Sequence, residues 1–113
     1  MGPFFVFEDT PTPRAMPEGW MVKPFGDWDG RSAAVAYDPR RYQVMVAFGV
    51  TRADVDGLRG GPTPRAMAFT TAGWVPFSFD YANRRSLWVR DLRTVGLPDP
   101  RPSPAVTPIG LER

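Results

Sequence analysis

The chain has 113 residues, of which 42% are hydrophobic and 13% aromatic, enough for the core of one domain. It contains no histidine and no cysteine, so disulfides and nucleophilic catalysis of the Ser-His-Asp or Cys-His kind are excluded. The net charge is only +2, although all but one of the 14 basic residues are Arg, and this disfavours a globally electrostatic nucleic-acid binder.

Two short strands are expected first, at Phe4–Phe7 and at 19–23, separated by a proline-rich segment that avoids helical backbone. The first apolar run is too short for a secretory signal. No run approaches the roughly 18 to 20 apolar residues of a membrane span. We therefore expect a cytoplasmic protein with no membrane partner.

The next stretch, Asp27-Trp28-Asp29-Gly30, contains alternate carboxylates followed by glycine, as at the start of a calcium-binding loop. Arg31 follows where further oxygen ligands would be needed, and no acid stands near the usual closing position. The pattern favours a plain turn with Trp28 against the core, without a metal.

Two apolar runs rich in strand-favouring residues, Ala33–Tyr37 and Tyr42–Phe48, then flank Asp38 and Pro39. Asp suits the first position of a type I turn, and the fixed φ of proline suits the second. The runs are therefore predicted to form a β-hairpin with one apolar face. Its cross-strand pairs would be Tyr37 with Tyr42, Val35 with Val44, and Ala33 with Val46.

After this hairpin, Thr51-Arg52-Ala53-Asp54 is a variant of the capping box, with Asp at the third position. It predicts one short helix over about 51–59, packed through Val55 and Leu58. Gly57 would lie inside the helix, and Gly60-Gly61 would end it.

The second half is predicted as a three-stranded meander. The strands are Met67–Thr71, Trp74–Asp80, and a third that begins near Leu87, with Arg84-Arg85 at the turn before it. The register of the last hairpin stays open between Phe79 opposite Trp88 and Phe79 opposite Leu87.

The hexapeptide Pro-Thr-Pro-Arg-Ala-Met occurs twice, at 11–16 and at 62–67, and each copy precedes a Gly-Trp pair and later a Tyr-x-x-Arg-Arg turn. This recurrence indicates an internal duplication. The expected fold is mainly β, a small barrel or sandwich built from two duplicated β-hairpin units with one short helix between them. Residues 1–96 would form the domain, and 97–113 a proline-rich extended or disordered tail.

The two arginine pairs on turns are the candidate binding residues, because guanidinium groups and neighbouring aromatic rings are common in binding sites. Charged turns also keep strand edges soluble without any partner. The hypothetical partner-binding set is Arg40, Arg41, Arg84, Arg85, Tyr37, Tyr42, Tyr81 and Trp28.

From this set we expect a non-catalytic module that binds another protein or itself, through these turns or an exposed strand edge, and that needs no cofactor. Nucleic-acid binding through the four arginines is the alternative. A third reading is small-molecule binding or catalysis in a barrel mouth.

Overall fold

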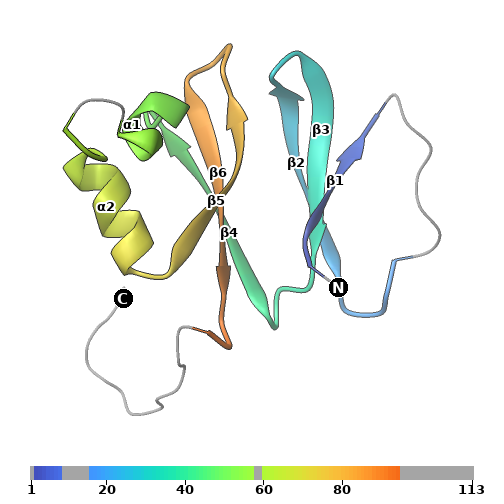
Figure 1. Ribbon diagram of the computed structural model, residues 1–113. Helices are drawn as coiled ribbons and strands as arrows, with labels where there is room; N and C mark the ends of the chain where they lie inside the picture. The colour runs from blue at the N-terminus through green and yellow to red at the C-terminus, as the bar shows by residue number, and fades with distance from the viewer. Residues whose placement is uncertain (1, 9–15, 58–59, 95–113) are drawn as a thin grey trace.

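The protein forms two antiparallel sheets that face each other, with two short helices on the outer side of one of them (Figure 1). The computed structural model describes residues 2–8, 16–57 and 60–94. The first sheet consists of β1 (Phe4–Phe7), β2 (Met21–Trp28) and β3 (Arg31–Tyr37). The second consists of β4 (Tyr42–Phe48), β5 (Trp74–Asp80) and β6 (Arg85–Asp91), with helices α1 (Arg52–Asp56) and α2 (Pro64–Thr71). The predicted mainly β fold is confirmed as a sandwich, since no pairing among the described strands closes a barrel.

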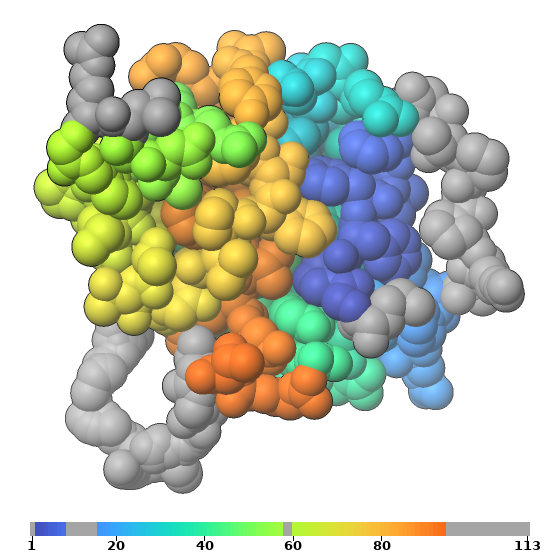
Figure 2. Space-filling view, in the orientation of Figure 1, coloured from blue at the N-terminus to red at the C-terminus, as the bar shows by residue number. Residues whose placement is uncertain are grey.

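The core lies between the two sheets, with a second cluster under the helices. Leu87 of β6 is fully buried between the sheets. Phe5 of β1 stacks on Phe77 of β5 with ring centroids 5.6 Å apart, and Figure 2 shows these two strands, blue and yellow-orange, in contact. On the outer face of the second sheet, Phe69 of α2 packs edge-on against Trp88 at 5.1 Å. Burial of each such side chain stabilises the fold by about 1.5–3 kcal/mol.

The two sheets have the same topology. Their strand orders are β1-β3-β2 and β4-β6-β5, so the third strand of each unit is central. The second strand of each unit carries a bulge, between Pro24 and Gly26 in β2 and between Pro76 and Ser78 in β5. In both units the repeated hexapeptide lies between the first and second strands. The structure is thus two similar sheets, as the repeat predicts.

The common topology also shows which turns correspond. Both central strands begin with an Arg-Ser pair, Arg31-Ser32 in β3 and Arg85-Ser86 in β6. The turn before β6 therefore corresponds to Asp29-Gly30, the turn before β3. Our pairing of the Arg84-Arg85 turn with the Arg40-Arg41 turn is wrong, because the latter connects the two units rather than two strands of one unit.

The predicted hairpin between β3 and β4 does not form. The turn itself is present, since the Asp38 carbonyl accepts hydrogen bonds from the N–H groups of Arg41 (3.0 Å) and Tyr42 (2.9 Å). The chain, however, leaves one sheet there and enters the other. Both edges of β3 are already paired, with β1 and with β2, so β4 pairs with β6 instead. Val35 and Val44 still pack together, face to face between the sheets.

The β5–β6 hairpin is confirmed, but with a register that we did not consider. Phe79 lies opposite Ser86, and Ser78 lies opposite Leu87. The bulge at Phe77 adds an unpaired residue on β5, which shifts every pair beyond it. The bulge does not account for our wrong placement of Phe79, which lies between it and the turn. The strands already pair at Asp80 and Arg85, so the turn is shorter than either predicted register requires.

The strand predicted at Met67–Thr71 is a helix, the C-terminal part of α2. Thr63 is its N-cap and accepts a hydrogen bond from the Ala66 N–H at 3.3 Å. Pro64 follows as the first helical residue, where its missing N–H does no harm. This Thr-Pro pair is the sequence signal that we overlooked.

The capping box of α1 is confirmed. The Thr51 hydroxyl accepts from the Asp54 N–H at 3.4 Å, and the Asp54 carboxylate accepts from the Thr51 N–H at 2.9 Å. The helix ends earlier than predicted, because Gly57 adopts a left-handed conformation with φ of 65° and is the C-cap. Gly60-Gly61 is therefore not the stop.

The proline-rich tail predicted for 97–113 lies outside the described residues, as does most of the first hexapeptide copy. Of the helices in the described part of the chain, none has the length and apolar character needed to cross a membrane.

Candidate binding site at the β5–β6 turn

The two arginine pairs lie at opposite ends of β6. Arg41 lies at the end where β4 begins, 3.7 Å from the carboxylate of Asp91. Arg85 lies at the other end, opposite Phe48, the last residue of β4. In Figure 1 these are the lower β3–β4 connection and the upper β5–β6 turn. The four arginines therefore do not form one patch.

The first arginine pair is bound to carboxylates. Arg40 is exposed and forms an ion pair with Asp38 at 2.8 Å, and it also donates to the Glu18 carbonyl at 3.2 Å. The hydrogen bond from Arg40 holds the pKa of Asp38 below its ordinary value. Arg41, besides its ion pair, lies over the ring of Tyr42 with 4.9 Å to the centroid.

Three aromatic residues of the predicted set are part of the core. Tyr37 and Tyr42 are 8% and 9% exposed and pack between the sheets. Trp28 is 3% exposed and donates its indole N–H to the Ser78 hydroxyl at 3.0 Å. These rings offer no free face to a partner. The prediction that Trp28 packs against the core is confirmed, but the turn is only Asp29-Gly30, because Asp27 and Trp28 are the last residues of β2.

The two arginines of the second pair have different surroundings. Arg85 has a structural role. Its Nε and one terminal guanidinium nitrogen both donate to a single oxygen, Oδ2, of Asp80, which is fully buried. The guanidinium also lies 4.9 Å from the centroid of the Trp28 ring. Arg85 also donates to the Asp27 carbonyl of the other sheet. The group thus joins the two sheets at this end of the sandwich.

The Asp80 carboxylate is fully engaged. Besides Arg85, it accepts hydrogen bonds from the side chain and the N–H of Asn83, at 2.9 and 3.3 Å, and from the Asp29 N–H at 2.9 Å. Burial by itself would raise the pKa of Asp80, but the hydrogen bonds from Asn83 and Arg85 outweigh it and hold the pKa below its ordinary value. These hydrogen bonds favour the ionised form of the carboxylate.

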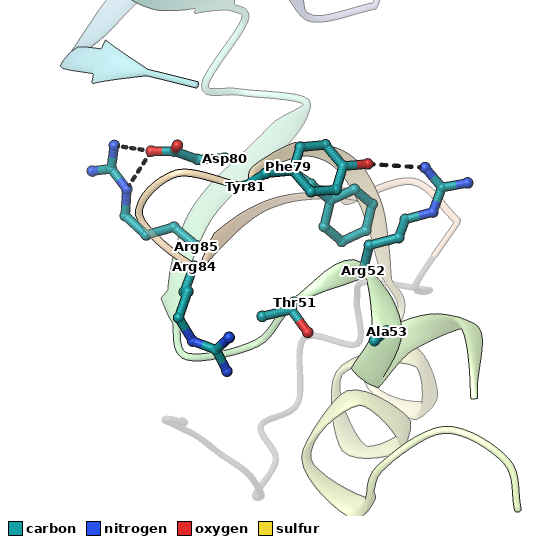
Figure 3. A pocket seen from close by; sticks show the side chains of 8 residues that line it. All are labelled: Thr51, Arg52, Ala53, Phe79, Asp80, Tyr81, Arg84 and Arg85. Carbon is teal, nitrogen blue, oxygen red and sulfur yellow. Dashed lines mark hydrogen bonds and ion pairs between the residues drawn. The ribbon is translucent and has the colours of Figure 1, made fainter. Parts of the chain in front are cut away.

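Next to this ion pair, a cavity of about 360 Å³ lies between the start of α1 and the β5–β6 turn (Figure 3). Its wall is largely apolar, formed by the rings of Phe79 and Tyr81 and the methyl group of Ala53, and Tyr81 is 59% exposed. The residues that line it are Thr51, Arg52, Ala53, Phe79, Asp80, Tyr81, Arg84 and Arg85.

Arg52 holds one wall of this cavity in place. It donates to the Tyr81 hydroxyl at 3.3 Å and lies over the Phe79 ring, 5.5 Å from its centroid. It also pairs with Asp56 at 3.1 Å, one turn further along α1. These contacts orient both rings, while most of the guanidinium stays accessible. No sequence pattern pointed to Arg52 as a site residue, because its contacts with Phe79 and Tyr81 join segments that are distant in the chain.

Arg84 borders the cavity on the other side. Figure 3 shows its side chain directed toward Thr51, away from Arg85. Its guanidinium has no hydrogen bond or ion pair with any residue that the structure describes. Its backbone is left-handed, with φ of 53°, a conformation that costs an ordinary residue about 1–2 kcal/mol.

A second, more open hollow adjoins the first and shares Arg85 with it. Phe48, which is 65% exposed, lies on its rim, and the Phe48 carbonyl accepts from Arg65 at 2.8 Å. One end of the sandwich therefore exposes two large aromatic residues, Phe48 and Tyr81, beside two arginines. We call Phe48, Arg52, Phe79, Tyr81 and Arg84 the tip surface.

Comparison with known proteins found no match to the chain among protein-family models, curated proteins or solved structures.

Proposed function

We propose that the protein is a non-catalytic interaction module that binds another protein through the tip surface. One observation carries this proposal: an apolar cavity at one end of the braced sandwich is bordered by the exposed ring of Tyr81, the half-buried ring of Phe79 and the guanidinium of Arg84. Among the described residues, that guanidinium has no hydrogen-bond or ion-pair partner. Tyr, Trp and Arg dominate the energetics of protein interfaces, and their anchors fill pockets of this kind. An exposed apolar patch rimmed by polar residues often marks an interaction site.

The nucleic-acid alternative has weaker support. Of the four turn arginines, Arg40, Arg41 and Arg85 each have a carboxylate partner. The two pairs also lie at opposite ends of the fold, so they do not neutralise neighbouring phosphates along one strand. Arg84 is the one turn arginine without an ion pair among the described residues, and a single such arginine beside aromatic rings suits a protein partner better.

Catalysis in the cavity also has weaker support. Asp80 is the carboxylate in the lining, and its oxygens are occupied by Arg85, Asn83 and Asp29. A general base needs a lone pair within reach of a substrate proton and a pKa near the working pH. Asp80 meets neither requirement, because its oxygens accept hydrogen bonds from Arg85, Asn83 and Asp29 and its pKa is lowered.

The proposal is tested with partner proteins captured from an extract of the source cells and then purified. Their dissociation constants are measured by calorimetry with the wild type and with Tyr81→Ala, at low and at high salt. Loss of an interface anchor of this kind typically weakens binding by about 2 kcal/mol. Arg40→Ala serves as the matched control, because Arg40 is an exposed arginine at the opposite end.

We expect Tyr81→Ala to bind more weakly and Arg40→Ala to bind like the wild type, with little dependence on salt. Equal affinity for Tyr81→Ala would contradict the proposal. Co-purified nucleic acid that dissociates at high salt would replace it with the nucleic-acid alternative.

A further inference from the structure

Arg84 combines two features that a structural arginine does not need. It holds a left-handed backbone conformation, which Gly or Asn adopts at much lower cost. Its guanidinium, beside the cavity, makes no hydrogen bond or ion pair within the described chain. A strained backbone conformation persists only where the surrounding structure holds it in place, and such residues cluster at functional sites.

We propose that the cavity binds a peptide segment in which a carboxylate stands next to an apolar side chain. The carboxylate pairs with Arg84, and the apolar side chain lies against Phe79 and Tyr81. This proposal rests on the proposed function and specifies the partner's chemistry.

The charges around the cavity agree with an acidic ligand. The planar guanidinium fork matches the two oxygens of a carboxylate, and such pairs are short and strong. Arg52 on the opposite wall adds a second guanidinium whose ion pair with Asp56 is exposed, with the two side chains 56% and 40% accessible. A surface pair of this kind is weak and gives way readily to a competing carboxylate.

The carboxylates near the cavity are already engaged in the fold. Asp80 is neutralised by Arg85. Asp54 lies close enough for the charge of Arg84 to help lower its pKa, but the backbone N–H of Thr51 is the larger cause of that shift. One oxygen of Asp54, Oδ2, accepts from both the N–H and the hydroxyl of Thr51 in the capping box. A ligand carboxylate therefore meets an arginine to which no acid of the described residues binds directly.

The size and lining of the cavity specify the apolar part of the ligand. Its volume of about 360 Å³ lies at the small end of ordinary ligand sites, enough for one large side chain with a neighbouring carboxylate. A bare phosphate would engage Arg84 but leave the Phe79 and Tyr81 rings in water. The bound peptide segment therefore carries an acidic residue adjacent to a leucine or an aromatic residue.

The test is an NMR titration of the whole protein, labelled with nitrogen-15, with the peptide acetyl-Ala-Leu-Asp-Ala-amide. The comparison ligands are the same peptide with Asn for Asp, the same peptide with Ala for Leu, and inorganic phosphate. We expect the amide signals of 51–53 and 79–85 to shift with the first peptide. Each of the other two peptides should bind about tenfold more weakly, the factor for about 1.4 kcal/mol of lost interaction.

Two variants examine the role of Arg84. Arg84→Gln keeps a polar side chain, though a shorter one, and removes the charge. Arg84→Gly removes the side chain and the backbone strain together. Both should lose about tenfold in affinity for the Asp peptide, and Arg40→Gln should bind it as the wild type does. Unchanged amide spectra elsewhere in each free variant establish that it is folded.

Equal binding of the Asp and Asn peptides, unchanged binding by folded Arg84→Gln, or tighter binding of phosphate than of the peptide would each overturn this inference. The proposed function survives such a result if purified partners still bind more weakly to Tyr81→Ala. If neither peptides nor partners respond to changes in the tip surface, both proposals fail.

Discussion

The N–H of Asp29 donates to the buried carboxylate of Asp80 at 2.9 Å, across a sequence separation of 51 residues. The Asp29 carboxylate in turn accepts from the N–H of Tyr81 at 3.1 Å. The corresponding turns of the two units are thus joined by reciprocal hydrogen bonds. This brace sets the position of the β5–β6 turn and, with it, of the tip surface.

The first prediction concerns the ion pair at the centre of this brace. Asp80→Asn should destabilise the protein by about 3 kcal/mol, because it leaves the guanidinium of Arg85 uncompensated in a site only 16% exposed. Urea denaturation monitored by tryptophan fluorescence gives the free energy of unfolding. Asp38→Asn is the control, because its pair with Arg40 is exposed, and it should lose at most about 1 kcal/mol. Equal losses for the two variants would show that the brace does not stabilise the fold.

The second prediction concerns acid. The pKa of Asp80 is lowered in the folded protein, so the native state binds this proton less readily than the unfolded chain. The contribution of Asp80 to stability is therefore complete above the ordinary Asp pKa of about 3.9 and is lost as the pH falls through the lower folded value. Denaturation midpoints of the wild type should fall over this range. The midpoints of Asp80→Asn should fall less steeply, and parallel curves would contradict the assignment.

The third prediction separates stability from binding at Arg84. Arg84→Asn should raise the free energy of unfolding by about 1 kcal/mol, because Asn tolerates the left-handed conformation better. Arg84→Ala keeps the strain and should show no such gain. Thermal denaturation of the three proteins is the measurement. A loss of stability in Arg84→Asn would mean that the arginine side chain holds the turn in place.

The fourth prediction concerns the end of α1. Gly57→Ala should cost more than about 2 kcal/mol, since the left-handed backbone strains any other residue and the new Cβ would lie 2.3 Å from the Gly61 carbonyl carbon. Gly60→Ala is the matched comparison. Gly60 also has a positive φ, but no atom lies within 4 Å of the Cβ that the substitution adds. Unfolding free energies from urea titrations should rank Gly57→Ala as the less stable variant. The reverse order would exclude the steric explanation.

The sequence by itself determined the features that depend on near neighbours. The turn at Asp38, the capping box of Thr51 and Asp54, and the alternating strand that ends at Asp80 all rest on contacts within a few residues. Local side-chain chemistry decides such elements wherever they lie in the fold. The repeated hexapeptide likewise predicted two similar units, because duplicated sequence conserves its topology.

The tertiary structure decided which strands pair and which side chains are free. β3 lies between β1 and β2 rather than beside β4, and this choice depends on competition among strands distant in sequence. Arg84 and Arg85 are neighbours of the same type, yet Arg85 is held by Asp80 and Trp28 while Arg84 borders the cavity. Arg52 and Tyr81 meet there because β5 ends and α1 begins at the same end of the sandwich, where Phe48 ends β4. Contacts of this kind come from chain segments far apart, and no local pattern encodes them.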